Sequence, residues 1–172
     1  MGSSGKWIVG GLLIILVGVI IAMQNQATSK SEPTAPIPAV ITVGEFTDLV
    51  PFTLGQISLL GSVADTDAER ARGLSDTTEI PVGVAKVFIF DTSALWSFWM
   101  KDMNYSIDIF WLDASGTVVH LVEEASPDTY PVTSFVPPVP ALYVIETKAG
   151  FARENNIGVG AVAGMTQVLT GR

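Results

Sequence analysis

Residues 97–113 read Ser-Phe-Trp-Met-Lys-Asp-Met-Asn-Tyr-Ser-Ile-Asp-Ile-Phe-Trp-Leu-Asp, and this stretch guides the interpretation of the rest of the chain. It places one lysine, Lys101, and three aspartates among large apolar side chains. A buried charge costs several kcal/mol unless it is paired or hydrogen-bonded. We therefore expect these charged side chains to have ion-pair partners, water or a ligand.

The sequence around this stretch has the pattern of short β-strands. Residues 107–112 and 117–122 are predicted to form a hairpin, because Gly116 lies in the turn between them and suits a positive φ. Further strands are expected where short runs are rich in apolar and β-branched residues, at 40–43, 56–64, 84–90, 96–101, 141–146 and 166–169.

Two short helices are predicted between these strands. Thr66 and Glu69 can cap each other's backbone amides at the start of one helix, and Gly73 can end it. Residues 150–156 are expected to form a second short turn of helix. Many short strands with two short helices indicate a β-rich α+β domain with a small, barrel-like, mostly antiparallel sheet.

An N-terminal transmembrane helix is predicted from residues 7–23, which contain no charged side chain. As a helix this run spans roughly 26 Å, close to the thickness of a bilayer core. The alternative is a cleaved signal peptide, but the residues that follow the run make a poor cleavage site. Lys6 before the run favours a single-pass anchor in the cytoplasmic membrane, with the globular domain on the outer side.

The chain divides into an anchor (1–23), a polar tether with three prolines (24–38) and one globular domain (39–172). The globular part has sixteen acidic and seven basic residues, a formal charge of about −9, which disfavours nucleic acid as a partner. There are no cysteines, and His120 is the single histidine. We therefore expect no disulfide, no metal site and no cofactor.

Several short motifs stand in order between Ile57 and Gly160. They read Val-Ala-Asp-Thr at 63–66, Glu-Arg-Ala-Arg-Gly-Leu at 69–74, Phe-Ile-Phe-Asp at 88–91, Phe-Trp-Met-Lys at 98–101, Ile-Asp-Ile at 107–109, Leu-Asp-Ala-Ser-Gly at 112–116, Ala-Leu-Tyr-Val-Ile-Glu at 141–146, Gly-Phe at 150–151 and Ile-Gly-Val-Gly at 157–160. Together they resemble the domain of unknown function 192 family, an uncharacterised prokaryotic family. The resemblance implies a small β-rich domain, often exported or membrane-tethered, with no assigned reaction. Asp102 departs from the family pattern, which usually has Asn there, and Ser106 departs from a frequent Pro.

Four residues are candidates for ligand binding. Arg72 and Lys101 could bind an anion, and Trp99 could line a binding face together with nearby aromatic residues. Asp108 is the fourth candidate for ligand binding. The alternative is that Trp99 is an ordinary core aromatic and that the charges form internal ion pairs, and we predict Asp108 or Asp91 as the partner of Arg72.

Asp102 and Asp108 are the candidate catalytic residues. Two carboxyl groups in different environments can serve as general acid and base, and these two would share a face of one uninterrupted strand. The alternative is that one caps a turn and the other forms an ion pair. The sequence contains no Gly-x-Ser-x-Gly motif and no phosphate-binding glycine loop before a helix.

We therefore favour a membrane-tethered, extracytoplasmic binding or accessory module over an enzyme. Its expected partners are the membrane, through residues 7–23, and an unknown small ligand or protein. The alternative function is a small hydrolase or lyase that uses Asp102 and Asp108 with Arg72 and Lys101.

Overall fold

The computed structural model describes residues 41–170, so the predicted anchor and tether lie outside the described residues. Within this range, no helix has the length and hydropathy needed to cross a membrane. The elements are β1 (Val50–Leu54), β2 (Ile57–Ala64), α1 (Asp67–Arg72), β3 (Val84–Ala94), β4 (Ile107–Leu112), β5 (Val118–Ala125), the 3₁₀ turn η1 (Pro127–Thr129), β6 (Ala141–Lys148), α2 (Phe151–Glu154), β7 (Ala163–Gly164) and α3 (Thr166–Thr170).

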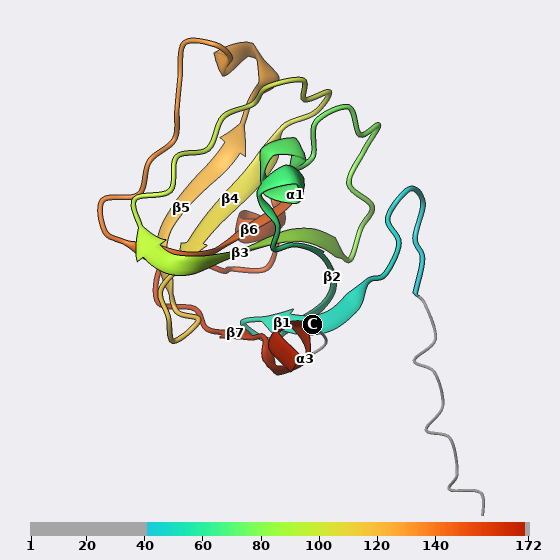
Figure 1. The fold of residues 1–172 in the computed structure, drawn as a ribbon, viewed down its shortest axis with the longest axis vertical. Coiled ribbons are helices and arrows are strands. Elements are labelled where there is room, and N and C mark those ends of the chain that lie inside the picture. The colour runs from blue at the N-terminus through green and yellow to red at the C-terminus, as the bar shows by residue number, and fades with distance from the viewer. Residues whose placement is uncertain (1–40, 171–172) are drawn as a thin grey trace, which may run out of the picture. The chain divides into compact units, whose positions relative to one another are not determined.

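These strands form one curled sheet in the order β5-β4-β6-β3-β2-β1-β7 (Figure 1). Neighbouring strands are antiparallel except β2 and β3, which are parallel and joined through α1. The residues before β7 also meet the start of β5, because the Val118 N–H donates to the Ala161 carbonyl at 2.8 Å. The expectation of a β-rich, mostly antiparallel, barrel-like sheet with short helices is confirmed.

Helix α1 begins and ends as its sequence predicts. The Thr66 hydroxyl accepts a hydrogen bond from the Glu69 N–H at 3.3 Å, and the Glu69 carboxylate accepts one from the Thr66 N–H at 3.0 Å. Gly73 ends the helix at a φ of +52°, and a Cβ there would lie 3.3 Å from Cζ of Phe88. The helix therefore packs closely on β3 and fixes where its last residue, Arg72, is presented.

Two predicted strands are wrong. Residues 96–101 make only an isolated bridge, in which Phe98 pairs with Phe135 in a proline-rich loop that cannot extend a ladder. Residues 166–169 belong to α3, where Val168 is the only buried residue. One buried position in this short segment suits a turn of helix, whereas a strand would alternate buried and exposed side chains.

The first strand was also misplaced. Residues 40–43 were expected to pair, but within the described residues Val43 forms only a local bridge to Phe46. The strand β1 lies further along the chain. It contains Pro51, and a proline disfavours a strand when only the sequence is considered. Pro51 is tolerated because β7 pairs only with Thr53 and Leu54, so β1 has one neighbour at the proline.

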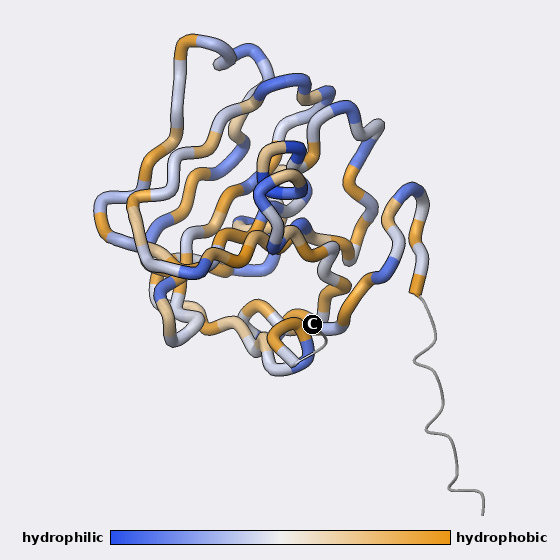
Figure 2. The backbone as a smooth tube through the Cα atoms, in the orientation of Figure 1, coloured by the Kyte–Doolittle hydropathy of each residue, from blue (hydrophilic) through white to orange (hydrophobic). Residues whose placement is uncertain are grey.

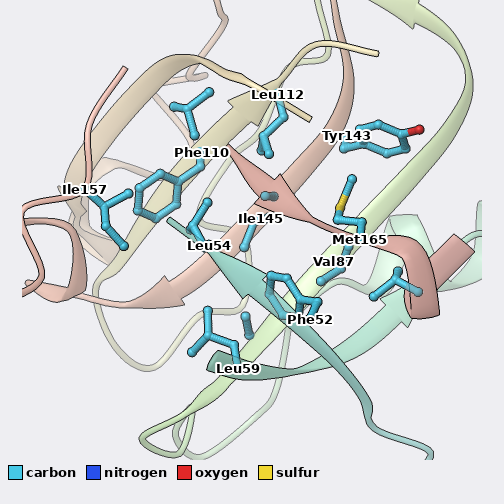
Figure 3. Packing of buried hydrophobic residues seen from close by; sticks show 14 of the residues in the cluster. Phe52, Leu54, Leu59, Val87, Phe110, Leu112, Tyr143, Ile145, Ile157 and Met165 are labelled. Atoms are coloured by element: carbon cyan, nitrogen blue, oxygen red, sulfur yellow. The ribbon is translucent and has the colours of Figure 1, made fainter. Parts of the chain in front are cut away.

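The sheet is covered on both faces, so β4 is buried along its whole length. One core fills the inside of the curl, where Figure 3 shows Phe52, Leu54, Phe110 and Ile145 converging. A second core lies on the opposite face and includes Phe88, Ile109, Trp111 and Val144. Leu74, just after α1, and the segment 96–105 pack against this second core, whereas α1 itself has no buried residue and is mostly hydrophilic in Figure 2.

Candidate functional site

Three polar side chains form a row across the sheet on the face that α1 covers. Lys86 of β3 lies opposite Ser62 of β2 and opposite Glu146 of β6 in the strand registers. Strand alternation places them there, because Lys86 is two residues from buried Phe88 and Glu146 is two residues after buried Val144. Lys86 Nζ donates a hydrogen bond to Ser62 Oγ at 3.2 Å.

Glu146 is a buried acid without a full set of partners. Its side chain belongs to a residue that is only 5% exposed, and its Oε2 atom has no hydrogen-bond partner. Burial raises the pKa of Glu146 to about 8, an effect that the nearby Lys86 partly opposes. Burial likewise lowers the pKa of Lys86. At neutral pH the Glu146 carboxyl is therefore mainly protonated and uncharged.

Glu146 forms the buried side of a cleft of about 300 Å³ between α1 and the segment 96–103. We call it the Glu146 cleft. Trp99 is 52% exposed on its outer side, and Phe98 is fixed by an edge-on contact with Phe88 at 4.9 Å between ring centroids. The lining residues are Arg70, Ala71, Arg72, Gly73, Leu74, Ser75, Phe88, Phe90, Trp96, Ser97, Phe98, Trp99, Lys101, Met103 and Glu146.

The three cationic side chains of the Glu146 cleft differ in how many hydrogen-bond or ion-pair partners they already have. Arg70 donates to the carbonyls of Asp65 and Ile89 and to the Asp67 carboxylate, and its guanidinium lies over the Phe90 ring. Lys101 has one long contact, 3.8 Å from its Nζ to the Asp102 carboxylate. Within residues 41–170, the exposed Arg72 guanidinium has no hydrogen bond or ion pair.

The predicted ion pair of Arg72 with Asp108 or Asp91 is therefore not formed. Arg72 is the last residue of α1 and lines the Glu146 cleft, whereas Asp108 lies on β4 and is fully buried. Arg72, Trp99 and Lys101 do come together around one cleft, as a shared site requires. Whether they bind a ligand there stays a prediction.

Asp108 has a structural role instead of a place in the Glu146 cleft. Its Oδ1 accepts hydrogen bonds from the N–H groups of Glu124 at 2.8 Å and Gly150 at 3.2 Å, and its Oδ2 accepts one from Ala152 at 2.9 Å. The carboxylate thus fixes the start of α2 against β4 and β5. It shares its side of the sheet with Phe110, which is opposite to the side of the Glu146 cleft.

The candidate catalytic pair, Asp102 and Asp108, is not assembled. Asp102 is exposed in a turn with a φ of +53°, and β4 begins only at Ile107. The break at Asn104 separates the two aspartates into different elements, so the alternation expected of one strand does not apply. Neither of them lines the Glu146 cleft.

Lys101 is held in place by the turn that follows α1. Its carbonyl accepts a hydrogen bond from the Ser75 hydroxyl at 2.9 Å, and the Asp102 carbonyl accepts one from the Asp76 N–H at 2.8 Å. The Tyr105 hydroxyl lies 2.6 Å from that of Thr77. The two walls of the Glu146 cleft are therefore tied to each other.

A second cleft, of about 430 Å³, lies on the other side of the end of α1. Arg72 and Gly73 border both clefts, and Lys86 lines the second one beside Glu69. The polar row across the sheet thus connects the two clefts beneath α1.

Glu146 and Lys86 were not among the residues predicted for a site. The signal that could have identified them is a single charged residue in each of two otherwise apolar strands, at 84–90 and 141–146. Such a charge is costly to bury and marks a position worth testing for function.

The family model of domain of unknown function 192 (DUF192), described as Uncharacterized ACR, matches residues 55–164. The chain belongs to this family. The matched range contains every residue that lines the Glu146 cleft, so the cleft is part of the DUF192 domain itself. A comparison with functionally curated proteins finds no match.

Two solved structures are similar to this DUF192 chain. One is a protein of unknown function from Novosphingobium aromaticivorans DSM 12444, with 27% identity and a TM-score of 0.65, covering 75% of this chain and 93% of that one. The other is from Sinorhizobium meliloti 1021 and is provisionally titled a transcription regulator. It has 20% identity and a TM-score of 0.63, covering 67% of this chain and 92% of that one. The second likeness concerns the fold alone.

Proposed function

We propose that this chain is a membrane-tethered, extracytoplasmic binding module whose small ligand occupies the Glu146 cleft. The observation that carries the proposal is the unpaired Oε2 of buried Glu146, which lies in a cleft with unpaired Arg72 and half-exposed Trp99. A buried polar atom without a partner costs about 1–3 kcal/mol. Sites that bind ligands often retain such unfavourable groups, because the ligand supplies the missing partner.

The tether in this proposal is supported by sequence. Residues 7–23 carry no charge and approach the length of a bilayer span, and residues 24–38 are polar and proline-punctuated. This arrangement would hold the DUF192 domain close to the outer surface of the membrane while leaving it free to meet a soluble ligand.

A second candidate function is a small hydrolase or lyase, now centred on Glu146. A carboxyl group with a pKa near neutrality, here about 8, suits a general acid. Glu146 is, however, the only carboxylate among the described residues that line the Glu146 cleft. Chemistry with two carboxyl groups would need a second one within reach, so we favour binding over catalysis.

The binding function can be tested with the small molecules that the protein retains on purification. Full-length chain is extracted from its membranes in a non-ionic detergent, and the released molecules are identified by mass spectrometry. Trp99→Ala should lose the molecule that the wild-type protein carries. Leu95→Ala is the matched control, because Leu95 is also 52% exposed but does not line the Glu146 cleft. Equal retention by the two variants would contradict the proposal.

A further inference from the structure

The charges of the Glu146 cleft indicate the kind of ligand that it accepts. Arg70 is already satisfied by two carbonyls and a carboxylate, so it contributes little to recognition. Arg72 has no partner among residues 41–170, and Lys101 has only the contact of 3.8 Å to exposed Asp102. Two cations with unused donors therefore face the cleft, and such donors bind carboxylates and phosphates.

Glu146 does not oppose an anion in the Glu146 cleft. Burial keeps its carboxyl mainly protonated at neutral pH, so it adds no negative charge. A protonated carboxyl can donate one hydrogen bond, whereas an ionised one only accepts. A cationic ligand would meet Arg72 and Lys101 without a carboxylate in the cleft to pair with.

The rest of the cleft is apolar and small. Trp99 presents an accessible ring, and Phe98 is held by edge-on contacts with Phe88 and with Trp111, at 4.9 and 5.8 Å between centroids. The volume of about 300 Å³ is at the lower end of small-molecule sites. This size suits a compact molecule with one apolar or aromatic part.

We propose that the Glu146 cleft binds a small organic anion, with its carboxylate or phosphate group on Arg72 and Lys101 and its apolar part on Trp99. The inference rests on the proposed binding function and names the ligand class for that same site. The carboxylate and the phosphate share the chemistry that the cleft recognises, and the probes below distinguish them.

The test is calorimetric titration of the full-length chain in a non-ionic detergent with four probes that share one ring. Benzoate and phenyl phosphate are the anions, benzylamine is the cation and benzyl alcohol is neutral. We expect one or both anions to bind at least about tenfold more tightly than the neutral probe, the factor that one charge-assisted hydrogen bond provides. The tighter anion identifies the headgroup class.

Variants then locate the anion within the protein. Arg72→Gln should weaken binding of the tighter anion about tenfold, because it removes the planar donor fork of the guanidinium. The melting temperature of the protein should stay unchanged, because Arg72 is exposed. Arg153→Gln is the control, because Arg153 is exposed and pairs with Glu124, away from the Glu146 cleft. Equal effects of the two variants would overturn the assignment.

Failure of the inference can be distinguished from failure of the proposed function. Tighter binding of benzylamine or benzyl alcohol than of both anions would overturn the anion class but leave a binding cleft. If no probe binds while the wild-type protein retains a molecule that Trp99→Ala lacks, the anion class is again overturned and the binding cleft stands. If no probe binds and no molecule is retained, both proposals fail.

Discussion

Lys86 and Glu146 lie directly opposite each other on β3 and β6, yet within the described residues they form no ion pair. Lys86 is hydrogen-bonded to Ser62 instead, and Oε2 of Glu146 has no partner. Opposite charges on facing positions of a sheet usually stabilise it. Their separation here leaves a protonatable group on the wall of a cleft, which is an arrangement suited to a ligand.

The stability of the protein should depend on pH through Glu146. Its pKa is about 8 in the folded protein against 4.5 ordinarily, so between these values the folded state holds a proton that the unfolded state has released. The free energy of unfolding should therefore fall as pH rises through this window, by at most about 1.4 kcal/mol per pH unit. Above the folded pKa the decline should level off.

Urea unfolding of wild-type protein and of Glu146→Gln, compared at several pH values, isolates this contribution. The glutamine variant keeps the size of the side chain but does not titrate, so its stability should fall less steeply between the two pKa values. Parallel pH profiles for the two proteins would show that Glu146 is already ionised in the folded state.

Replacing Asp108 should destabilise the fold. Asp108→Ala leaves two buried N–H groups and one partly buried N–H group without their acceptor, and we expect the free energy of unfolding to fall by about 3 kcal/mol or more. Asp102→Asn is the matched control, because Asp102 is exposed and Asn tolerates its positive φ. Urea unfolding should show almost no change for this control. A comparably small loss for Asp108→Ala would contradict the structural role.

Gly73 should be required for the stability of the close contact between the end of α1 and β3. Gly73→Ala places a side chain at a φ of +52° and within 3.3 Å of the Phe88 ring, and we expect a loss of about 1–3 kcal/mol in stability. Gly158→Ala is the control, because its φ is not positive and a Cβ there meets nothing within 4 Å. Thermal unfolding of both variants makes the comparison, and equal melting temperatures would rule out strain at Gly73.

The predicted anchor can be tested by extraction. Membranes containing the full-length chain are washed with high salt and then with alkaline carbonate, which removes proteins held only at the surface. We expect the chain to remain in the pellet, because residues 7–23 are apolar enough to stay in a bilayer. A mature N-terminus between Gln24 and Ser31 would instead show that the run is a cleaved signal.

Local patterns in the sequence predicted much of the fold. The reciprocal capping of Thr66 and Glu69, the hairpin around Gly116 and the apolar runs of β3 and β6 each depend on neighbouring residues, and all are present. The errors arose where distant partners decide the structure. Residues 96–101 lack a strand because their partner is a proline-rich loop, and Pro51 is allowed because β7 is short.

The candidate site was predicted in part for the same reason. Arg72 and Lys101 are predicted from sequence as cations that could bind an anion and Trp99 as part of an aromatic binding face, and the fold brings all three to one cleft. The role of Asp108 could not be derived, because its partners Gly150 and Ala152 are more than forty residues away. Glu146 was overlooked because its apolar strand appeared to be only core.

The most direct test of the Glu146 cleft is NMR shift mapping on the ¹⁵N-labelled full-length chain in a non-ionic detergent. The probes are a library of small aromatic acids, amines and amides, and the Trp99 indole signal is assigned by its absence in Trp99→Phe. We predict that binders shift the signals of Trp99, Lys101 and Gly73 and leave those of Val82 and Gly164, which line a different cleft, unchanged. Shifts confined to other surfaces, or none across the library, would contradict the account.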